Sequence, residues 1–277
     1  MEVEQKFDND FNELKTGVKK LLGFNTFQYK DTYLGRRFQA RMRSYHIDNY
    51  HEYWELLKKD EKEQDQLLKD LTINVTEFFR DNTVYEVFKD EVLPTVINEK
   101  NGKIRVWSAG SSDGKEAYSI AIIATEILGE RNATDRVEII GTDIDRTCLQ
   151  RAASGEYESR PGIVQTDLKQ QLKFSDSYEK YFDVNNNYYK IKPQIKNMVK
   201  FEYHDLISGS KKRNFDIIFC RNVVIYFNRE LQQILYKDFY NALNTHGFFI
   251  MGKTETLVGE ARDHFITYNS KERIFRK

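Results

Sequence analysis

The residues best suited to chemistry lie in a short turn and at the end of the strand predicted after it. The turn, residues 110–114, reads GSSDG, and its small side chains let backbone N–H groups approach a ligand closely. Asp143 closes the next apolar run, where its carboxylate can accept hydrogen bonds from the hydroxyl groups of a ribose. A turn and an acid in this order predict a binding site for a nucleotide-like ligand.

Three predicted elements position these residues. Residues 104–107 form a short apolar run with β-branched and aromatic members, which is typical of a buried strand. Residues 116–128 have apolar side chains at helical spacing and end before Gly129, which predicts a helix with its stop signal. Residues 137–141 predict a second strand. This order of elements is the first half of a nucleotide-binding α/β fold.

The glycine pattern favours one class of adenosine ligand. GSSDG lacks the G-x-G-x-x-G rhythm, and the distance from Gly110 to Asp143 exceeds the roughly 20 residues of a dinucleotide fingerprint. Both features favour S-adenosylmethionine (SAM) over NAD. The turn alone leaves open an ordinary α/β connection that binds no ligand.

The composition of the 277 residues narrows the class of protein. Lys+Arg and Asp+Glu number 43 each, so the formal net charge of zero gives no reason to expect nucleic-acid binding. The two cysteines, Cys148 and Cys220, and the absence of a secretion signal predict a cytoplasmic location. No apolar run approaches the ~18 residues of a membrane span. His, Cys and Asp do not cluster with metal-ligand spacing, so no metal is expected.

The chain before residue 73 is predicted to be an all-helical domain, with residues 60–65 as a charged connector. Its second helix, residues 33–45, carries four arginines within eight residues and no acid among them. This local basic face is either a solvated helix surface or a docking surface for an acidic partner. The four are Arg36, Arg37, Arg41 and Arg43.

The chain from residue 73 to 277 is predicted to continue the α/β fold. Residues 156–197 interrupt it with a predicted hairpin around residues 185–187. The rhythm resumes with strands at 199–203 and 215–220, a helix at 229–243 and a turn at 244–247. A strand at 248–251 and a closing hairpin around residues 269–270 complete the chain.

Four segments in this order resemble the chemotaxis receptor methyltransferase (CheR) family. They are INVTEFFRD at 73–81, RVWSAGSSDGKEAYS at 105–119, GTDID at 141–145 and FDIIFCRNVVIYF at 215–227, and GKTE at 252–255 matches more loosely. The resemblance implies an all-α N-terminal domain and a Rossmann-like SAM domain with a small antiparallel β-subdomain inserted. It also implies a protein-glutamate O-methyltransferase that forms methyl esters on the helical cytoplasmic stalk of chemotaxis receptors.

The resemblance also assigns roles along a SAM pocket. Arg80 would face the methionine end, Asp143 would hold the ribose, and Tyr226 would lie beside the sulfonium. The other implied cofactor residues are Asn74, Thr76, Gly110, Glu116, Asp205, Leu206, Asn222 and Val223. Departures from the family pattern are Asp113 in the turn, Ala117 in place of proline and Lys253 in place of histidine.

The residue types fit such a transfer. A glutamate acceptor is ionised at neutral pH, with an unperturbed pKa of about 4.3, so no general base is needed. Arg80 can grip a carboxylate in a planar fork, and Tyr226 can orient a reacting group through its hydroxyl. We therefore expect these two residues to be catalytic.

The resemblance also implies a partner, the acidic helical stalk of a receptor, which the arginine face would contact. A receptor C-terminal peptide could add as a strand to the inserted subdomain. We expect a monomer that neither inserts into a membrane nor binds nucleic acid. The alternatives are a catalytically silent SAM-binding scaffold and a methyltransferase for a nucleic acid or small molecule.

Overall fold

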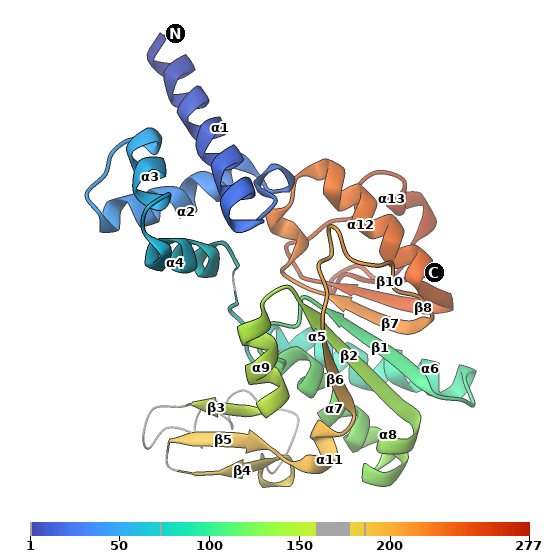
Figure 1. Cartoon of the computed structure of the whole chain (residues 1–277). Helices are drawn as coiled ribbons and strands as arrows, with labels where there is room; N and C mark the ends of the chain where they lie inside the picture. Colours follow the sequence, from blue (N-terminus) through green and yellow to red (C-terminus); the bar gives the residue numbers. More distant parts are fainter. Residues whose placement is uncertain (1, 73, 159–177, 186) are drawn as a thin grey trace. The chain divides into compact units, whose positions relative to one another are not determined.

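The computed structural model describes residues 2–72, 74–158, 178–185 and 187–277, and the chain divides into two compact units (Figure 1). Unit 1 contains the residues up to 73 together with Tyr226–Leu231. Unit 2 contains Asn74–Ile225 and Gln232–Lys277. The predicted division at residue 72 gave no hint that Tyr226–Leu231 would join the N-terminal unit.

Unit 1 is helical, as predicted for the N-terminal domain. Its elements are α1 (Glu2–Leu22), η1 (Thr26–Gln28), α2 (Asp31–Ser44), α3 (Tyr50–Leu57) and α4 (Glu61–Leu71). The charged connector predicted at residues 60–65 is wrong, because these residues begin α4. The Asp60 carboxylate accepts the N–H groups of Lys62 at 3.0 Å and Glu63 at 3.1 Å, which caps the helix. Glu63 itself is buried. The buried face of α4 therefore includes a charged residue, which a search for apolar residues at helical spacing overlooks.

Unit 2 is built on a seven-stranded sheet in the order β6-β2-β1-β7-β8-β10-β9. The first five strands in that order are parallel, whereas β10 and β9 are antiparallel. The strands are β1 (Ile104–Ala109), β2 (Val137–Asp143), β6 (Val199–Tyr203), β7 (Phe215–Cys220), β8 (Leu243–Met251), β9 (Ile266–Asn269) and β10 (Ile274–Arg276). The predicted Rossmann-like architecture is confirmed.

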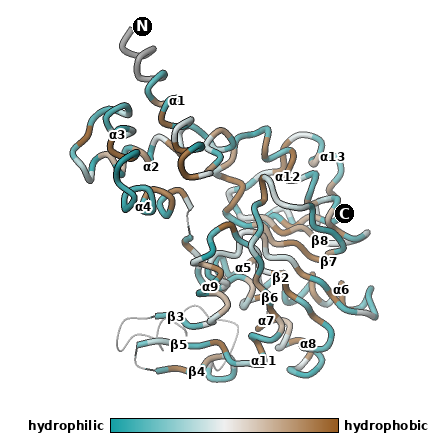
Figure 2. The backbone as a smooth tube through the Cα atoms, in the orientation of Figure 1, coloured by the Kyte–Doolittle hydropathy of each residue, from teal (hydrophilic) through white to brown (hydrophobic). Residues whose placement is uncertain are grey.

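Helices cover both faces of this sheet. The helical elements in this part of the chain are α5 (Asn82–Val87), η2 (Phe88–Val92), α6 (Leu93–Glu99), α7 (Lys115–Leu128), α8 (Glu130–Arg136), α9 (Arg146–Ser154), α11 (Pro193–Lys196), η4 (Val224–Tyr226), α12 (Arg229–Ala242) and α13 (Ala261–His264). Neighbouring strand residues point to opposite faces, which explains the near-continuous apolar runs. Phe219 of β7 packs against Phe88, whereas Trp107 of β1 and Phe249 of β8 pack against Phe239 of α12. Figure 2 shows β7 and β8 as hydrophobic.

A separate three-stranded antiparallel sheet, in the order β3-β5-β4, forms the inserted subdomain. Its strands are β3 (Glu156–Glu158), β4 (Phe182–Val184) and β5 (Tyr188–Ile191), and η3 (Tyr178–Lys180) precedes β4. The antiparallel pairing of β4 with β5 confirms the predicted hairpin. The rest of the predicted insertion, residues 159–177, lies outside the described residues.

The turn predicted at residues 244–247 is wrong, because β8 runs through it. The pairing of β8 with β7 shifts instead, from Phe215 opposite Leu243 to Ile217 opposite Phe248. His246 has a positive φ of 66° within this irregularity, and Asn244 donates to the Asp216 carboxylate at 2.8 Å. The turn-forming residues therefore produce a bulge within a strand.

Two helical glycines of unit 1 predict opposite effects of the same substitution. A Cβ on Gly17 of α1 would lie 2.6 Å from the Trp54 ring, whereas the nearest atom to one on Gly35 of α2 is the Tyr50 hydroxyl at 3.7 Å. We expect Gly17→Ala to lower the free energy of unfolding by about 1–3 kcal/mol through overpacking. Gly35→Ala should raise it by up to about 1 kcal/mol, because alanine favours the helix. Urea titration followed by circular dichroism measures both, and a stabilising Gly17→Ala would contradict the packing.

Candidate functional site

The candidate site lies at the carboxyl ends of the parallel strands of unit 2. The chain proceeds from β1 to β2 and β6 on one side and then returns to β7 on the other side of β1. Strand order therefore reverses at β1, and the loops that follow β1 and β7 diverge there. Open α/β sheets bind ligands in the crevice formed at such a reversal.

The turn after β1 is held against the end of β2. Gly110 and Ser111 both donate their N–H groups to the Thr142 carbonyl at 2.8 Å, and Ser112 donates to the Asp143 carboxylate at 2.8 Å. Gly110 has a φ of 78°, and a Cβ there would lie 2.5 Å from Val223. The structure thus brings together three predicted site residues, Gly110, Asp143 and Val223.

Polar atoms in this turn suit a bound ligand. Ser111 Oγ and Asp113 Oδ1 are buried and have no hydrogen-bond partner within the described residues. Buried polar atoms in folded proteins normally have a partner, which here can be an ordered water or a polar ligand. The Ser111 hydroxyl and the carboxylates of Asp113 and Asp143 fit the polar groups of an adenosine-containing cofactor. The expectation that the backbone N–H groups at the start of the turn meet a ligand is wrong for residues 110–112, because these groups already donate within the protein. Burial raises the pKa of Asp143, and the backbone N–H groups that it accepts oppose that rise.

Asn74 reaches the same acid through Asp145. Its side-chain amide donates to Asp145 Oδ2 at 2.6 Å, and the Asp145 N–H donates to Asp143 Oδ1 at 2.9 Å. The other Asp145 oxygen caps α9 by accepting from Thr147. The backbone N–H of His204 donates to the Asp143 carbonyl at 3.0 Å. This bond places the neighbouring Asp205 at the carboxyl ends of the strands.

Arg80 and Glu116, two of the predicted cofactor residues, are linked through Arg221. Its guanidinium donates to the Arg80 carbonyl at 2.8 Å and lies 3.6 Å from the Glu116 carboxylate. Glu116 is buried and accepts from Ser108 at 2.8 Å. Burial raises the pKa of Glu116, whereas the Arg221 charge lowers it. Two other predicted cofactor residues, Thr76 and Leu206, are half-buried.

Glu255 is a central residue that sequence reasoning did not select. Its buried carboxylate accepts four backbone N–H groups: those of Val223 and Val224 on Oε1 and those of Asn222 and Gly252 on Oε2, at 2.6–3.1 Å. Asn222 has a φ of 59°, so this carboxylate fixes an otherwise unfavourable loop conformation. The one sequence signal was the glutamate of the loosely matching GKTE segment.

The remaining candidates lie in unit 1. The Tyr226 ring is 4.9 Å from that of Tyr33, and its carbonyl accepts the Lys30 N–H at 2.9 Å. Its predicted place beside the sulfonium stays a prediction.

Arg41 donates to the buried Glu63 at 2.5 and 2.9 Å and approaches Asp70, so it holds the helices together.

The other three arginines of the predicted face have looser environments. Arg36 and Arg43 are exposed, and Arg37 is half-buried with its guanidinium 5.6 Å from the centre of the Tyr33 ring.

Among the helices that the structure describes, none is long and apolar enough to cross a membrane. The described residues also contain no cluster of His, Cys, Asp or Glu that could hold a metal.

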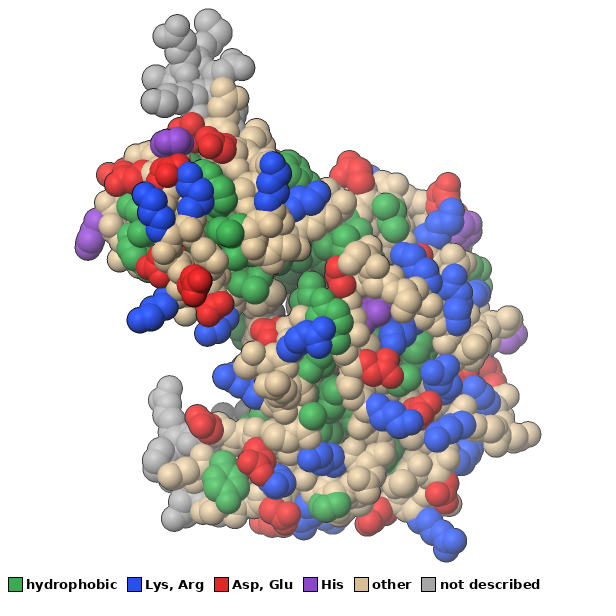
Figure 3. Space-filling model, in the orientation of Figure 1, with side chains coloured by type: hydrophobic (Ala, Val, Ile, Leu, Met, Phe, Trp, Pro, Cys, Tyr) green, Lys and Arg blue, Asp and Glu red, His purple; other side chains and the backbone are tan. Residues whose placement is uncertain are grey.

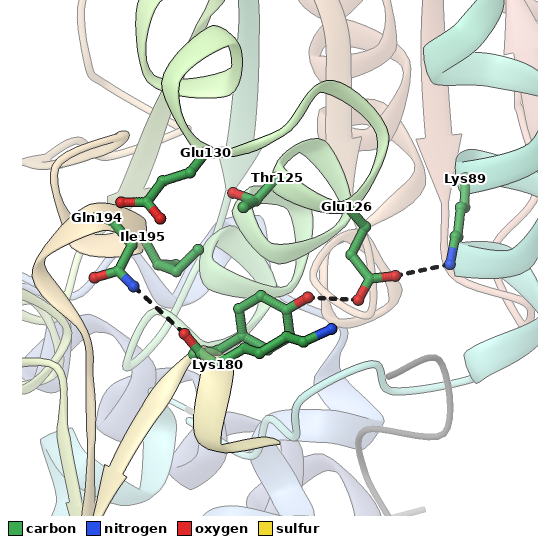
Figure 4. Close-up of a pocket in the computed structure, with 8 residues that line it drawn as sticks. Lys89, Thr125, Glu126, Glu130, Lys180, Gln194 and Ile195 are labelled. Atoms are coloured by element: carbon green, nitrogen blue, oxygen red, sulfur yellow. Dashed lines mark hydrogen bonds and ion pairs between the residues drawn. The ribbon is translucent and has the colours of Figure 1, made fainter. Parts of the chain in front are cut away.

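A cavity of about 600 Å³ occupies another part of unit 2 (Figure 4). It is lined by Lys89, Thr125, Glu126, Glu130, Lys180, Tyr181, Gln194 and Ile195. Glu126 accepts from Lys89 at 2.8 Å and from Tyr181 at 2.5 Å in this cavity. Glu126 and Glu116 are ten residues apart on α7, about 15 Å along its axis. None of the predicted site residues lines this cavity.

Comparison with known proteins matches almost the whole chain. A model described as the SAM-binding domain of CheR methyltransferase matches residues 74–274, and one described as its all-alpha domain matches residues 9–72. A chemotaxis protein methyltransferase of Listeria innocua is 32% identical over 263 residues, which covers 95% of this chain and 96% of the relative. One from Borreliella burgdorferi is 28% identical over 281 residues, with the same coverage of both chains.

The Glu255 contacts predict a stability effect. We expect Glu255→Gln to lower the free energy of unfolding by about 2–3 kcal/mol, because an amide nitrogen cannot accept the N–H groups and leaves buried donors unpaired. Glu260→Gln is the matched control, since Glu260 is exposed and lies 3.8 Å from Lys237; it should change stability by no more than about 0.5 kcal/mol. Urea titrations of the full chain measure both. Equal effects would show that the four N–H bonds contribute little.

Proposed function

Because this chain belongs to the CheR methyltransferase family, we propose that it methylates glutamate side chains of chemotaxis receptors. Family membership establishes a SAM-dependent methyltransferase of chemotaxis. The glutamate acceptor, the roles of individual residues and the docking surface are the proposal. The reaction would place the protein in the cytoplasm, where we expect it to act as a monomer.

The observation that carries this proposal is the environment of Arg80. Arg80 as a whole is half-buried, and its guanidinium donates to the Val75 carbonyl at 2.9 Å. It forms no ion pair with a carboxylate of the described residues, unlike Arg221 and Arg41. An arginine that is held near the sheet edge without an acidic partner is available to a carboxylate from a ligand.

The residues around Arg80 would hold SAM, which supplies an electrophilic methyl group on its sulfonium. Asp143 would accept the ribose hydroxyls, and Glu116 would face the cationic amino end of the methionine portion. Since Glu255 takes the N–H groups of Asn222 and Val223, only their carbonyl groups and side chains remain for the cofactor. Asn74 and Thr76 would line the pocket, and Asp205 and Leu206 would flank the adenine.

The acceptor glutamate would arrive as a carboxylate, so proton removal is unnecessary. Arg80 would aim its oxygen at the methyl group, and the Tyr226 hydroxyl would help to orient the reacting groups. Desolvation and alignment would then account for most of the acceleration.

Docking is proposed to use the exposed arginines of α2. Arg41 is excluded because Glu63 and Asp70 engage it. Arg36 and Arg43 remain exposed, and Arg37 is half-buried beside them. Figure 3 shows basic and acidic side chains interspersed on the visible face, so attraction to an acidic receptor helix would be local. In the inserted subdomain, β3 and β4 are edge strands, and one of them could accept a receptor C-terminal peptide.

Label transfer tests the reaction. We expect methyl-labelled SAM and receptor-containing membranes to yield a receptor label that mild base releases, as methyl esters require. Arg80→Ala should lower kcat by about 100-fold with little change in melting temperature, because the acceptor is no longer aligned. Arg131→Ala, which replaces an exposed arginine of α8, is the control. No transfer by the natural chain would favour a silent scaffold, and a base-stable label would indicate a different acceptor.

Charge reversal tests docking. The pair Arg36→Glu and Arg43→Glu should raise the KM for receptor about tenfold or more, because it replaces local attraction with repulsion. SAM affinity should stay unchanged, and added salt should weaken the docking of the natural chain. Lys62→Glu reverses another exposed charge of unit 1 and serves as control. Equal effects of the control and the pair on KM would remove α2 from the docking surface.

A further inference from the structure

We propose that Arg221 is a positioning residue for methyl transfer, which fixes both the turn that carries Arg80 and the carboxylate of Glu116. This inference rests on the proposed function, because that function gives Arg80 and Glu116 their roles. Arg221 directly follows β7, at the reversal of strand order, and only 2% of its side chain is exposed. Arg221 is too deeply buried to contact a docked partner, so its role must follow from its contacts within unit 2.

One guanidinium reaches three segments of unit 2. Nη2 donates to the Arg80 carbonyl at 2.8 Å and to the Asp81 carboxylate at 2.9 Å. Nη1 lies 3.4 Å from the Tyr85 hydroxyl of α5 and 3.6 Å from the Glu116 carboxylate of α7. A planar arginine fork can make such contacts in several directions at once.

The turn that carries Arg80 needs this support. Phe79 and Asp81, the residues on either side of Arg80, have φ values of 51° and 58°. Side chains disfavour this left-handed region, and such conformations persist where surrounding contacts enforce them. Ser119 accepts the Phe79 N–H at 3.0 Å, which holds the start of the turn. The contacts from Arg221 to Arg80 and Asp81 hold its end.

Arg221 also favours the ionised form of Glu116. The Glu116 carboxylate is buried beside Ser108, Tyr85 and the more distant Glu255, and burial favours its neutral form. The Arg221 guanidinium is the nearby cation that favours the ionised form. Glu116 can attract the cationic end of SAM only when it is ionised. The same side chain therefore supports cofactor binding through Glu116 and alignment through Arg80.

Arg105 provides a matched comparison. It lies near the amino end of β1, where its guanidinium also bonds a carboxylate, that of Glu138, and two backbone carbonyls, those of Arg213 and Asn214. Arg105 has the same types of partner, but 32% of its side chain is exposed, against 2% for Arg221, and it lies at the opposite end of its strand from the candidate site. Any loss common to Arg105→Met and Arg221→Met reflects structural support alone.

The test is a double-mutant cycle on the full chain, with SAM affinity measured by calorimetry and kcat measured by receptor labelling. We expect Arg221→Met to weaken SAM binding and to lower kcat about 100-fold, whereas Arg105→Met should change neither. In an Arg80→Ala background, Arg221→Met should lower kcat by less than about threefold, because the alignment is already lost. Arg221→Lys keeps the charge beside Glu116 but not the fork, so it should restore SAM affinity while kcat stays low.

Each result bears on a different claim. Additive losses of kcat in the cycle, or an Arg105→Met loss equal to that of Arg221→Met, would overturn the positioning role. If Arg221→Met does not fold, Arg221→Lys decides, and natural kcat in that variant would overturn it as well. Absence of transfer by the natural chain would instead refute the proposed function. Natural transfer and an inactive Arg80→Ala beside an unaffected Arg221→Met would refute only this inference.

Discussion

Three carboxylates are buried at the carboxyl edge of the parallel sheet, and their need for donors organises the loops there. Glu255 accepts four backbone N–H groups, and Asp143 accepts those of Ser112 and Asp145. Glu116 depends on the Ser108 hydroxyl and the Arg221 charge. A buried charge without partners would be prohibitively unfavourable, so each acid fixes the chain segments that supply its donors. The candidate site is shaped by this requirement more than by the glycine turn alone.

The N-terminal unit uses the same principle for a different purpose. Glu63 is buried in α4 and is matched by Arg41 of α2 and the Tyr53 hydroxyl of α3. An arginine that looks like part of a docking surface is therefore part of the packing. The side chains left for a partner are those that no internal acid engages, above all Arg36 and Arg43. Sequence spacing predicted Arg41 as part of the basic face, but the carboxylates that engage Arg41 lie 22 and 29 positions away, which spacing along one helix does not reveal.

The features that could be predicted from the sequence are those determined by residues close together in the chain. The strands at Val199–Tyr203 and Phe215–Cys220 were predicted with their observed bounds. Phe215–Cys220 is buried along its whole length and reads as a near-continuous apolar run, whereas Val199–Tyr203 is an edge strand whose apolar residues alternate with exposed charged ones. The start of α4 was missed because its signal is a cap and a buried acid among charged residues. The bulge in β8 was read as a turn because asparagine and glycine favour both. Glu255 and Arg221 were missed because most of their partners come from segments distant in the chain.

The buried acids also bear on which ligand the edge favours. Burial raises the pKa values of Glu116 and Asp143, so both ionised forms are costly without a cation or donors nearby. A cofactor with a cationic ammonium and a sulfonium stabilises ionised acids, whereas the product of methyl transfer has lost the sulfonium charge. If these acids hold SAM as proposed, their attraction weakens once the methyl group has left. Carboxylates that order the loops before the reaction would then also favour release of the product after it.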